Sequence, residues 1–232
     1  MRIGRKTVDG NENFSQLNKR LDDGELYELC FHTKEKKDNS RFYAIILCLF
    51  LLFVGLRTYW INNFGGIVVD GASMKQTLQD GDKLLMRYAT ANTKLERGDV
   101  IIVDVRSYPE CGSTDFLIKR LIALEGDKVK CVDGNLCICY AGESEYTYVE
   151  ESYAYYYLNK SDYDFGEYVV REGEIFFLGD NRQNSMDSRY EQAGGSHLAS
   201  SLYKVEDVYG VVPDWAITYR AFLGAVFFHD IR

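Results

Sequence analysis

The sequence predicts a mainly β protein that is preceded by one apolar helix. Residues 42–56 carry no charged side chain, which predicts a long apolar helix. Most later segments are short apolar or β-branched runs that end at turns containing Gly and Asp. Helical amphipathic periodicity is almost absent from these later segments. Because tight turns join neighbouring antiparallel strands, this pattern favours an antiparallel sheet.

Composition excludes some classes of function. The chain has 232 residues and a formal net charge of −8, and its acidic body argues against nucleic-acid binding. Residues 1–41 hold nine Lys/Arg and eight Asp/Glu, whereas the remainder holds 18 and 27. The six cysteines and three histidines (His32, His197 and His229) show no zinc spacing, so we expect neither a metal nor another cofactor.

The first element, residues 1–41, is a polar tail. Phe14, Leu17 and Leu21 have helical spacing, and the Asp22-Asp23-Gly24 stretch ends it. We therefore expect a short amphipathic helix in a mostly solvated segment without evident chemistry.

The second element is a membrane anchor over residues 42–60. The uncharged run is shorter than the span of about 20 residues that a bilayer requires. Tyr59 and Trp60 extend it beyond Arg57, whose long side chain can reach lipid head groups. A buried core helix is disfavoured because the run is apolar on all faces. A cleaved signal peptide is disfavoured because a charged tail precedes the run and no small-x-small site follows.

The basic residues before the anchor predict its orientation. Lys34, Lys36, Lys37 and Arg41 stand close to its amino-terminal end. The positive-inside rule then places residues 1–41 in the cytoplasm and residues 61–232 outside, with a single pass through the membrane.

The sequence of residues 61–232, the body, predicts a series of strands. We expect strands at residues 67–69, 83–88, 100–105, 116–124, 174–178 and 205–212, with a hairpin over 128–140. Residues 141–170 are rich in Tyr and acidic residues and predict an irregular insertion, either a packed aromatic cluster or a binding surface. The apolar run 221–228 is too short to span, so it packs in the core or touches the bilayer surface.

Two cysteines flank the hairpin tip at Asp133-Gly134-Asn135. A cross-strand disulfide between Cys131 and Cys137 fits this spacing, and an oxidising compartment would permit it. Two free thiols are the alternative. Cys111 and Cys139 have no evident partner.

The candidate chemistry begins at Ser73. This serine follows the Asp70-Gly71 turn at a strand end, where its hydroxyl is free to face a cleft. Alone it reads as an ordinary turn serine, because a nucleophile needs a base. Lys119 stands within an apolar strand, where burial would lower its pKa and leave an amine able to accept a proton. An outward-facing strand lysine is the alternative.

Four segments, taken together, carry a family resemblance. They are Gly71–Leu78, Arg97–Ile101, Ile118–Asp127 and Gly179–Arg189, in this order and behind the apolar run. The set resembles the conserved boxes of the bacterial type I signal peptidases (leader peptidases), over roughly residues 42–212. The resemblance implies a coiled antiparallel β-sheet catalytic body with a smaller inserted β subdomain at about 128–173.

The resemblance also implies an activity. It is that of a membrane-anchored serine endopeptidase that removes signal peptides from exported preproteins and prefers small residues at −1 and −3. The implied partners are preprotein signal peptides and the lipid bilayer, and the substrate would lie as an added strand beside the Ser73 strand.

Site roles follow from the matching positions. The resemblance implies that Ser73 would be the nucleophile and Lys119 the general base. Ser185 would orient the lysine, Asp187 would pair with Arg189, and Asp180 would join their network. The small substrate pockets would be lined by Val69, Met74, Leu78, Leu117 and Ile118. Gly71 stands where some members supply a serine hydroxyl to the oxyanion hole, and Gln76 stands where proline is common.

Two other functions are alternatives to a signal peptidase. A self-cleaving regulator with a Ser/Lys site would need a DNA-binding domain, and the run 42–56 disfavours it. A catalytically inactive extracytoplasmic binding domain on an anchor would leave Ser73 and Lys119 with structural roles only.

Overall fold

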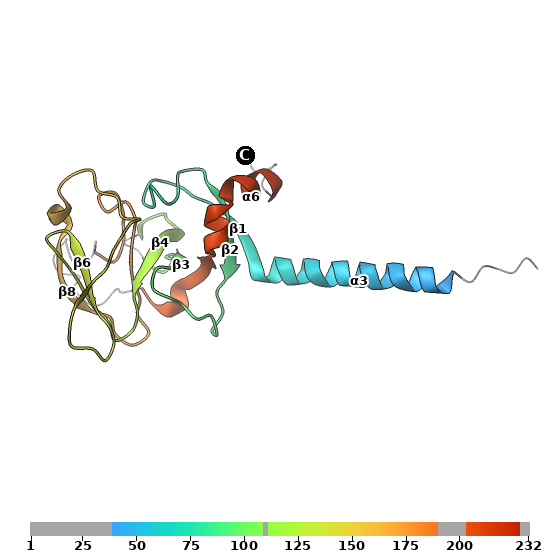
Figure 1. Ribbon diagram of the computed structural model, residues 1–232, viewed down its shortest axis with the longest axis horizontal. Helices are drawn as coiled ribbons and strands as arrows, with labels where there is room; N and C mark the ends of the chain where they lie inside the picture. Colours follow the sequence, from blue (N-terminus) through green and yellow to red (C-terminus); the bar gives the residue numbers. More distant parts are fainter. Residues whose placement is uncertain (1–38, 109–110, 190–202, 228–232) are drawn as a thin grey trace, which may run out of the picture. The chain divides into compact units, whose positions relative to one another are not determined.

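The computed structural model describes residues 39–108, 111–189 and 203–227 (Figure 1). The predicted tail helix around Phe14, Leu17 and Leu21 lies outside these ranges, as do all three histidines. Internal contacts divide the chain into one unit that ends at Gly55 and a second that begins at Leu56. The predicted division into tail, anchor and body stays a prediction.

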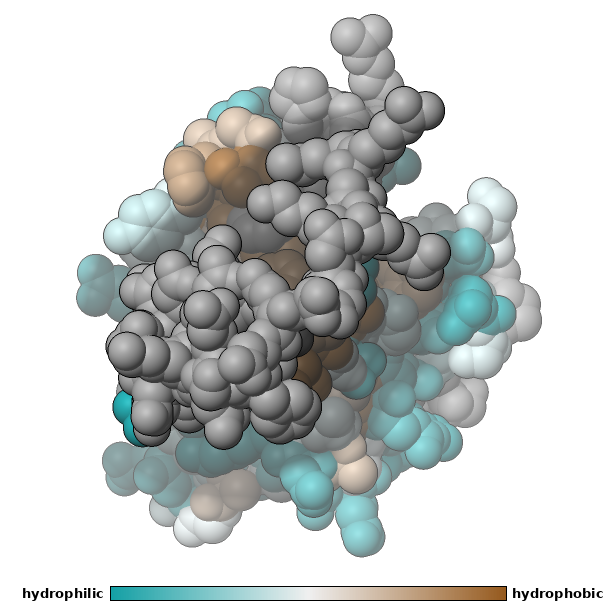
Figure 2. Space-filling model, turned by 90° about the vertical axis from the view of Figure 1, so that its right-hand side faces the viewer, coloured by the Kyte–Doolittle hydropathy of each residue, from teal (hydrophilic) through white to brown (hydrophobic). Residues whose placement is uncertain are grey.

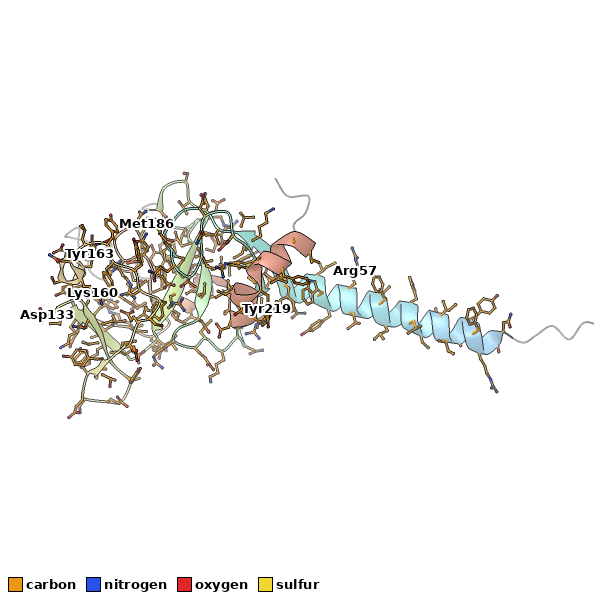
Figure 3. The ribbon with its side chains drawn as sticks, turned by 45° about the horizontal axis from the view of Figure 1, so that its top comes forward. Arg57, Asp133, Lys160, Tyr163, Met186 and Tyr219 are labelled. Carbon is orange, nitrogen blue, oxygen red and sulfur yellow. The ribbon has the colours of Figure 1, made fainter. Side chains whose placement is uncertain are left out.

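Helix α3 runs from Ser40 to Asn63 and covers the predicted anchor. Its 24 residues include none that is buried, so the alternative of a buried core helix is wrong. At about 1.5 Å per residue the helix exceeds the roughly 30 Å of bilayer hydrocarbon. It is long and apolar enough to cross a membrane. Arg57 projects outward from it (Figure 3).

The larger sheet holds six strands, and every pairing in it is antiparallel. The strands are β1 (Phe64–Val68), β2 (Lys83–Tyr88), β3 (Val100–Asp104), β4 (Phe116–Ala123), β9 (Phe176–Leu178) and β10 (Val208–Val212). Their order is β1-β2-β10-β3-β4-β9, so β1 and β9 are the edge strands and the sheet does not close.

A second, four-stranded sheet is inserted between β4 and β9. It consists of β5 (Lys128–Val132), β6 (Asn135–Cys139), β7 (Thr147–Tyr148) and β8 (Phe165–Val169), in the order β7-β6-β5-β8. Within the body, β6 and β8 lie at the opposite end from β1, β2 and α6 (Figure 1). The predicted fold class, an apolar helix followed by an antiparallel β body with an inserted β subdomain, is confirmed.

A shared apolar core joins the two sheets. Phe176 and Leu178 of the larger sheet pack against Val129, Leu136 and Ile138 of the inserted one, and all five are almost fully buried. At the far end of the insertion a 3-10 turn, Lys160–Tyr163, packs on the β5–β6 hairpin tip. Figure 3 shows Asp133 of this tip near Lys160 and Tyr163.

Of the two alternatives left open for Cys131 and Cys137, the structure has the second, because both are free thiols. In the β5–β6 register Cys131 lies opposite Leu136, and Cys137 lies opposite Lys130. Directly opposed residues share a face and neighbours along a strand alternate, so the two cysteines point to opposite faces of the sheet. The hairpin was predicted correctly, but its register separates the thiols.

The last described residues, up to Phe227, form helices where the sequence indicated only an apolar run. After the 3-10 turn Val205–Asp207 and strand β10 come α5 (Asp214–Thr218) and α6 (Arg220–Phe227). Leu223 of α6 is buried in the core near β2, whereas Phe222 and Val226 are 66% and 53% exposed. Figure 2 shows hydrophobic residues, coloured brown, on the surface of the face that it draws. The run therefore packs into the core along one side only.

Candidate active site

Ser73 lies on a turn that leaves the edge strand β1. Just beyond β1 the chain is still held to the neighbouring segment by the Val69 N–H bond to Asp82 O, 2.9 Å. Gly71 then adopts a φ of +89°, a left-handed conformation that glycine accepts without strain. Its amide donates to Asp80 Oδ1 at 2.8 Å, which fixes the approach to Ser73.

Lys119 lies in the middle of β4, opposite Ile101 of β3. Alternation along the strand puts it on the same face as Leu117 and Leu121, which are both buried. Lys119 itself is only 2% exposed. The alternative of an outward-facing lysine is therefore wrong.

The two side chains meet although they are far apart in sequence. Lys119 Nζ lies 2.9 Å from Ser73 Oγ and 2.9 Å from the carbonyl oxygen of Ile118. Burial lowers the pKa of Lys119 to about 8, against the opposing fields of Asp187 and Asp180. A lysine amine of this kind is neutral often enough near neutral pH to take a proton from a serine hydroxyl.

A loop after β9 carries the predicted supporting residues. Asp187 is fully buried; it accepts a hydrogen bond from the Gly179 amide at 3.0 Å and pairs with Arg189 at 2.9 Å. Burial disfavours the carboxylate, but Arg189 holds the pKa of Asp187 below its ordinary value. The expected pairing of Asp187 with Arg189 is thus present in the geometry.

Ser185 does not make the hydrogen bond that was expected. Its hydroxyl is buried but does not bond Lys119, whose partners are Ser73 and Ile118; it faces Asp187 instead and helps to lower the pKa of that carboxyl. Ser185 also packs against Gly179, where an added Cβ would lie 2.1 Å from Ser185 Oγ and 2.7 Å from Ser73 O. The loop can pass this close to Ser73 only because residue 179 is glycine.

Asp180 was expected to join the Asp187–Arg189 network, and this expectation is wrong. Its carboxylate pairs in a two-pronged manner with Arg120, at 2.8 and 2.7 Å, and also accepts a hydrogen bond from the Thr77 hydroxyl. Because Arg120 follows Lys119 and Thr77 lies four residues after Ser73, this cluster ties the base strand to the serine turn. Neither Arg120 nor Thr77 was predicted from the sequence, although a second cation in an apolar strand is a usable signal.

A cleft of about 720 Å³ opens beside Ser73 and Lys119. Of the predicted pocket residues, Val69, Leu117 and Ile118 line it. Met74 and Leu78 do not, because both are fully buried in the core. Other residues that line the cleft were not predicted from the sequence. They include Ile67, Met86, Tyr88, Phe116, Met186 and Tyr209. Figure 3 labels Met186, which comes from the loop after β9.

Comparison with known proteins identifies the family. The family model described as signal peptidase, peptidase S26, matches residues 39–222. The chain belongs to this family. It is accordingly a serine endopeptidase, and the family's activity is signal-peptide cleavage by a serine peptidase.

Two relatives, both named signal peptidase I, agree with this assignment. Signal peptidase I of Bacillus licheniformis is 37% identical over 166 residues, which cover 68% of this chain and 84% of the relative. Signal peptidase I P of Bacillus subtilis subsp. natto is 31% identical over 192 residues, covering 77% and 90%. A crystal structure of a signal peptidase I from Enterococcus faecalis V583 is 27% identical, with a TM-score of 0.37 and coverage of 52% of this chain and 98% of that one.

The four segments that carry the signal peptidase resemblance have different places in the fold. Those beginning at Gly71, Ile118 and Gly179 converge on the Ser73–Lys119 contact. The segment Arg97–Ile101 touches the site through its neighbours, because Ile101 pairs with Lys119 and the Gly98 carbonyl accepts a hydrogen bond from Arg120 at 2.8 Å. Arg97 itself makes a two-pronged ion pair with buried Asp127, both contacts being 2.7 Å. This pair fixes the ends of two turns, so its part in the site is indirect.

Proposed function

We propose that this chain is a membrane-anchored signal peptidase in which Ser73 is the nucleophile and Lys119 the general base. The observation that carries the proposal is the 2.9 Å contact between Ser73 Oγ and the buried Lys119 Nζ. The lowered pKa of Lys119, to about 8, supports the same roles, because a base must be unprotonated to act.

The reaction follows from these two groups. Ser73 Oγ attacks the carbonyl carbon of substrate residue −1 while Lys119 Nζ takes the hydroxyl proton, which gives a tetrahedral oxyanion. Lys119 then returns the proton to the leaving amine, so that the peptide bond breaks and an ester to Ser73 remains. A water molecule, giving a proton to Lys119, hydrolyses this ester, and the proton returns to Ser73.

The oxyanion requires donors that are free to reach it. The Ser73 amide donates no hydrogen bond within the described residues, so it is available. The Gly71 amide is already bonded to Asp80, and glycine has no hydroxyl to offer. We therefore assign the Ser73 N–H as the backbone donor.

The substrate binds as an extended strand in the cleft beside Ser73. Strand β1 is a sheet edge with unpaired backbone groups, which is the usual platform for an added strand. Val69, Leu117, Ile118 and Met186 line the space into which residues −1 and −3 would point. Such bulky lining favours small side chains at these positions by excluding large ones.

Helix α3 holds the chain in the cell membrane, with the tail in the cytoplasm and the catalytic body outside. Its length and composition, together with Lys34, Lys36, Lys37 and Arg41 before it, support this orientation. Protease added to intact cells should digest the body and spare the tail. Digestion of the tail alone would reverse the orientation.

The decisive test is substitution of the two central residues. Ser73→Ala and Lys119→Ala should each abolish cleavage of a synthetic preprotein, with thermal unfolding still cooperative. Ser144→Ala and Lys94→Ala are matched controls at exposed positions and should retain full activity. Full activity of Ser73→Ala would exclude the mechanism, and failure of the unchanged chain to cleave any preprotein would favour the inactive binding domain instead.

A further inference from the structure

Asn181 makes two hydrogen bonds to the serine turn. It is 4% exposed and follows Asp180 in the loop after β9. Its backbone N–H donates to the Ser73 carbonyl at 2.9 Å, and its side-chain Nδ2 donates to the Ala72 carbonyl at 3.0 Å. One residue therefore fixes two consecutive peptide units at the proposed nucleophile.

The bond to Ala72 helps to fix where the Ser73 amide points. In a trans peptide the carbonyl and the N–H of one unit point in opposite directions. Because Asn181 holds the Ala72 carbonyl, the Ser73 N–H of the same unit is directed away from Asn181. Ser73 lines the cleft and Asn181 does not, so this direction is toward the substrate.

We propose that Asn181 is a positioning residue that aims the Ser73 amide at the developing oxyanion. This inference rests on the proposed role of Ser73 and adds the residue that prepares its oxyanion donor. Preorganised donors are effective because they need no rearrangement when charge develops.

Backbone contacts with Tyr155 also hold the loop that carries Asn181. Tyr155 and Asn181 form an isolated parallel β-bridge. In it the Tyr155 amide donates to the Asp180 carbonyl at 2.7 Å, and the Arg182 amide donates to the Tyr155 carbonyl at 3.1 Å. The Lys75 amide also donates to the Ala72 carbonyl, at 3.1 Å. Loss of the Asn181 side chain thus leaves that carbonyl paired, and the main effect should fall on orientation rather than folding.

The experiment uses the full-length chain in detergent micelles with a synthetic signal-peptide substrate. Asn181→Ala removes the donor without adding charge, and Asn181→Asp removes it at nearly constant size. Asn135→Ala is the matched control, because Asn135 Nδ2 also donates to a main-chain carbonyl, at 3.1 Å, but at the hairpin tip. The measurements are kcat, KM, the inhibition constant of a substrate-derived peptide aldehyde, and thermal unfolding.

Both Asn181 variants should lose about 100-fold in kcat with KM unchanged. The peptide aldehyde, whose adduct with Ser73 is tetrahedral, should bind weaker by a similar factor. Asn135→Ala should match the unchanged chain. The inference is overturned if Asn181→Ala keeps its kcat, or if KM rises with no loss of kcat. Activity of Ser73→Ala, tested beside them, would instead overturn the proposed function.

Discussion

At the scale of single residues, the fold keeps the side chain of Lys119 buried, although burial disfavours its charged form. Burial lowers the pKa of Lys119 from 10.5 to about 8, which corresponds to about 3 kcal/mol. Because the folded pKa lies below the unfolded one, stability falls as pH drops from about 10.5 to about 8 and is constant below that. The proposed mechanism depends on this lowered pKa, since a fully solvated lysine would stay protonated near neutral pH and could not act as a base.

The rate should therefore follow the neutral fraction of Lys119. We expect kcat/KM to rise with pH and to reach half its maximum near pH 8, so that about a tenth of the amine is active at pH 7. A pH–rate profile on a synthetic signal peptide checks this. A profile that is flat from pH 6 to 9 would contradict the role of Lys119, and exposed Lys94→Ala should leave the profile unchanged.

The strand and turn patterns pointed to Ser73 and Lys119 only together with the family resemblance, and the 2.9 Å contact between them fits that pairing. Their catalytic roles stay a prediction. The sequence did not separate the neighbours of Ser73 into cleft and core. Met74 and Leu78 are buried because the chain turns back on itself after Ser73, with Leu78 N bonded to Met74 O at 2.8 Å. Asn181 escaped prediction because its bonds to Ala72 and Ser73 join distant segments.

At the scale of elements, the turn after Ser73 contains an unusual conformation. Gln76 has a φ of +88°, a left-handed value that costs a residue with a side chain about 1 kcal/mol. The next residue, Thr77, bonds Asp180. Proline, common at this position in the family, is locked near −65° and does not fit this turn.

Two substitutions of Gln76 should therefore act in opposite directions. Gln76→Gly should raise the free energy of unfolding by about 1 kcal/mol, because glycine adopts this φ freely. Gln76→Pro should lower both stability and kcat, because the turn and the Thr77–Asp180 bond must shift. Urea unfolding and steady-state kinetics measure these effects. Gln79→Gly, in the same segment without a positive φ, is the control and should not stabilise.

The strands were largely predictable, because turns and β-branched runs mark them within short windows. Strand register was not, since it depends on pairing between segments. The free thiols of Cys131 and Cys137 illustrate this limit, because a correct hairpin with one fixed register sends them to opposite faces. Helices α5 and α6 were missed because their apolar run shows no polar face that would reveal helical periodicity.

At the scale of the whole body, the inserted sheet is joined to the active-site loop by a buried ion pair. Arg182 of the loop and Glu151 of the Tyr-rich segment are 2% and 8% exposed. Arg182 also donates to Gly179 O at 3.0 Å and to the Tyr156 hydroxyl at 3.2 Å. Burial disfavours the guanidinium, but Glu151 raises the pKa of Arg182 above its ordinary value. The Tyr-rich insertion thus supports the loop that carries Asn181.

Breaking this pair should affect stability and catalysis together. Arg182→Ala leaves the Glu151 carboxylate buried without its partner, which should cost about 3–5 kcal/mol in urea unfolding. It should also lower kcat, because the loop loses its contacts with Gly179 and Tyr156. Arg182→Met combined with Glu151→Leu removes both charges and should recover most of the stability. Lys94→Ala breaks an ion pair whose side chains are 85% and 65% exposed, so it should change stability by less than about 1 kcal/mol. If Arg182→Ala proved equally mild, the insertion would not support the loop through Glu151.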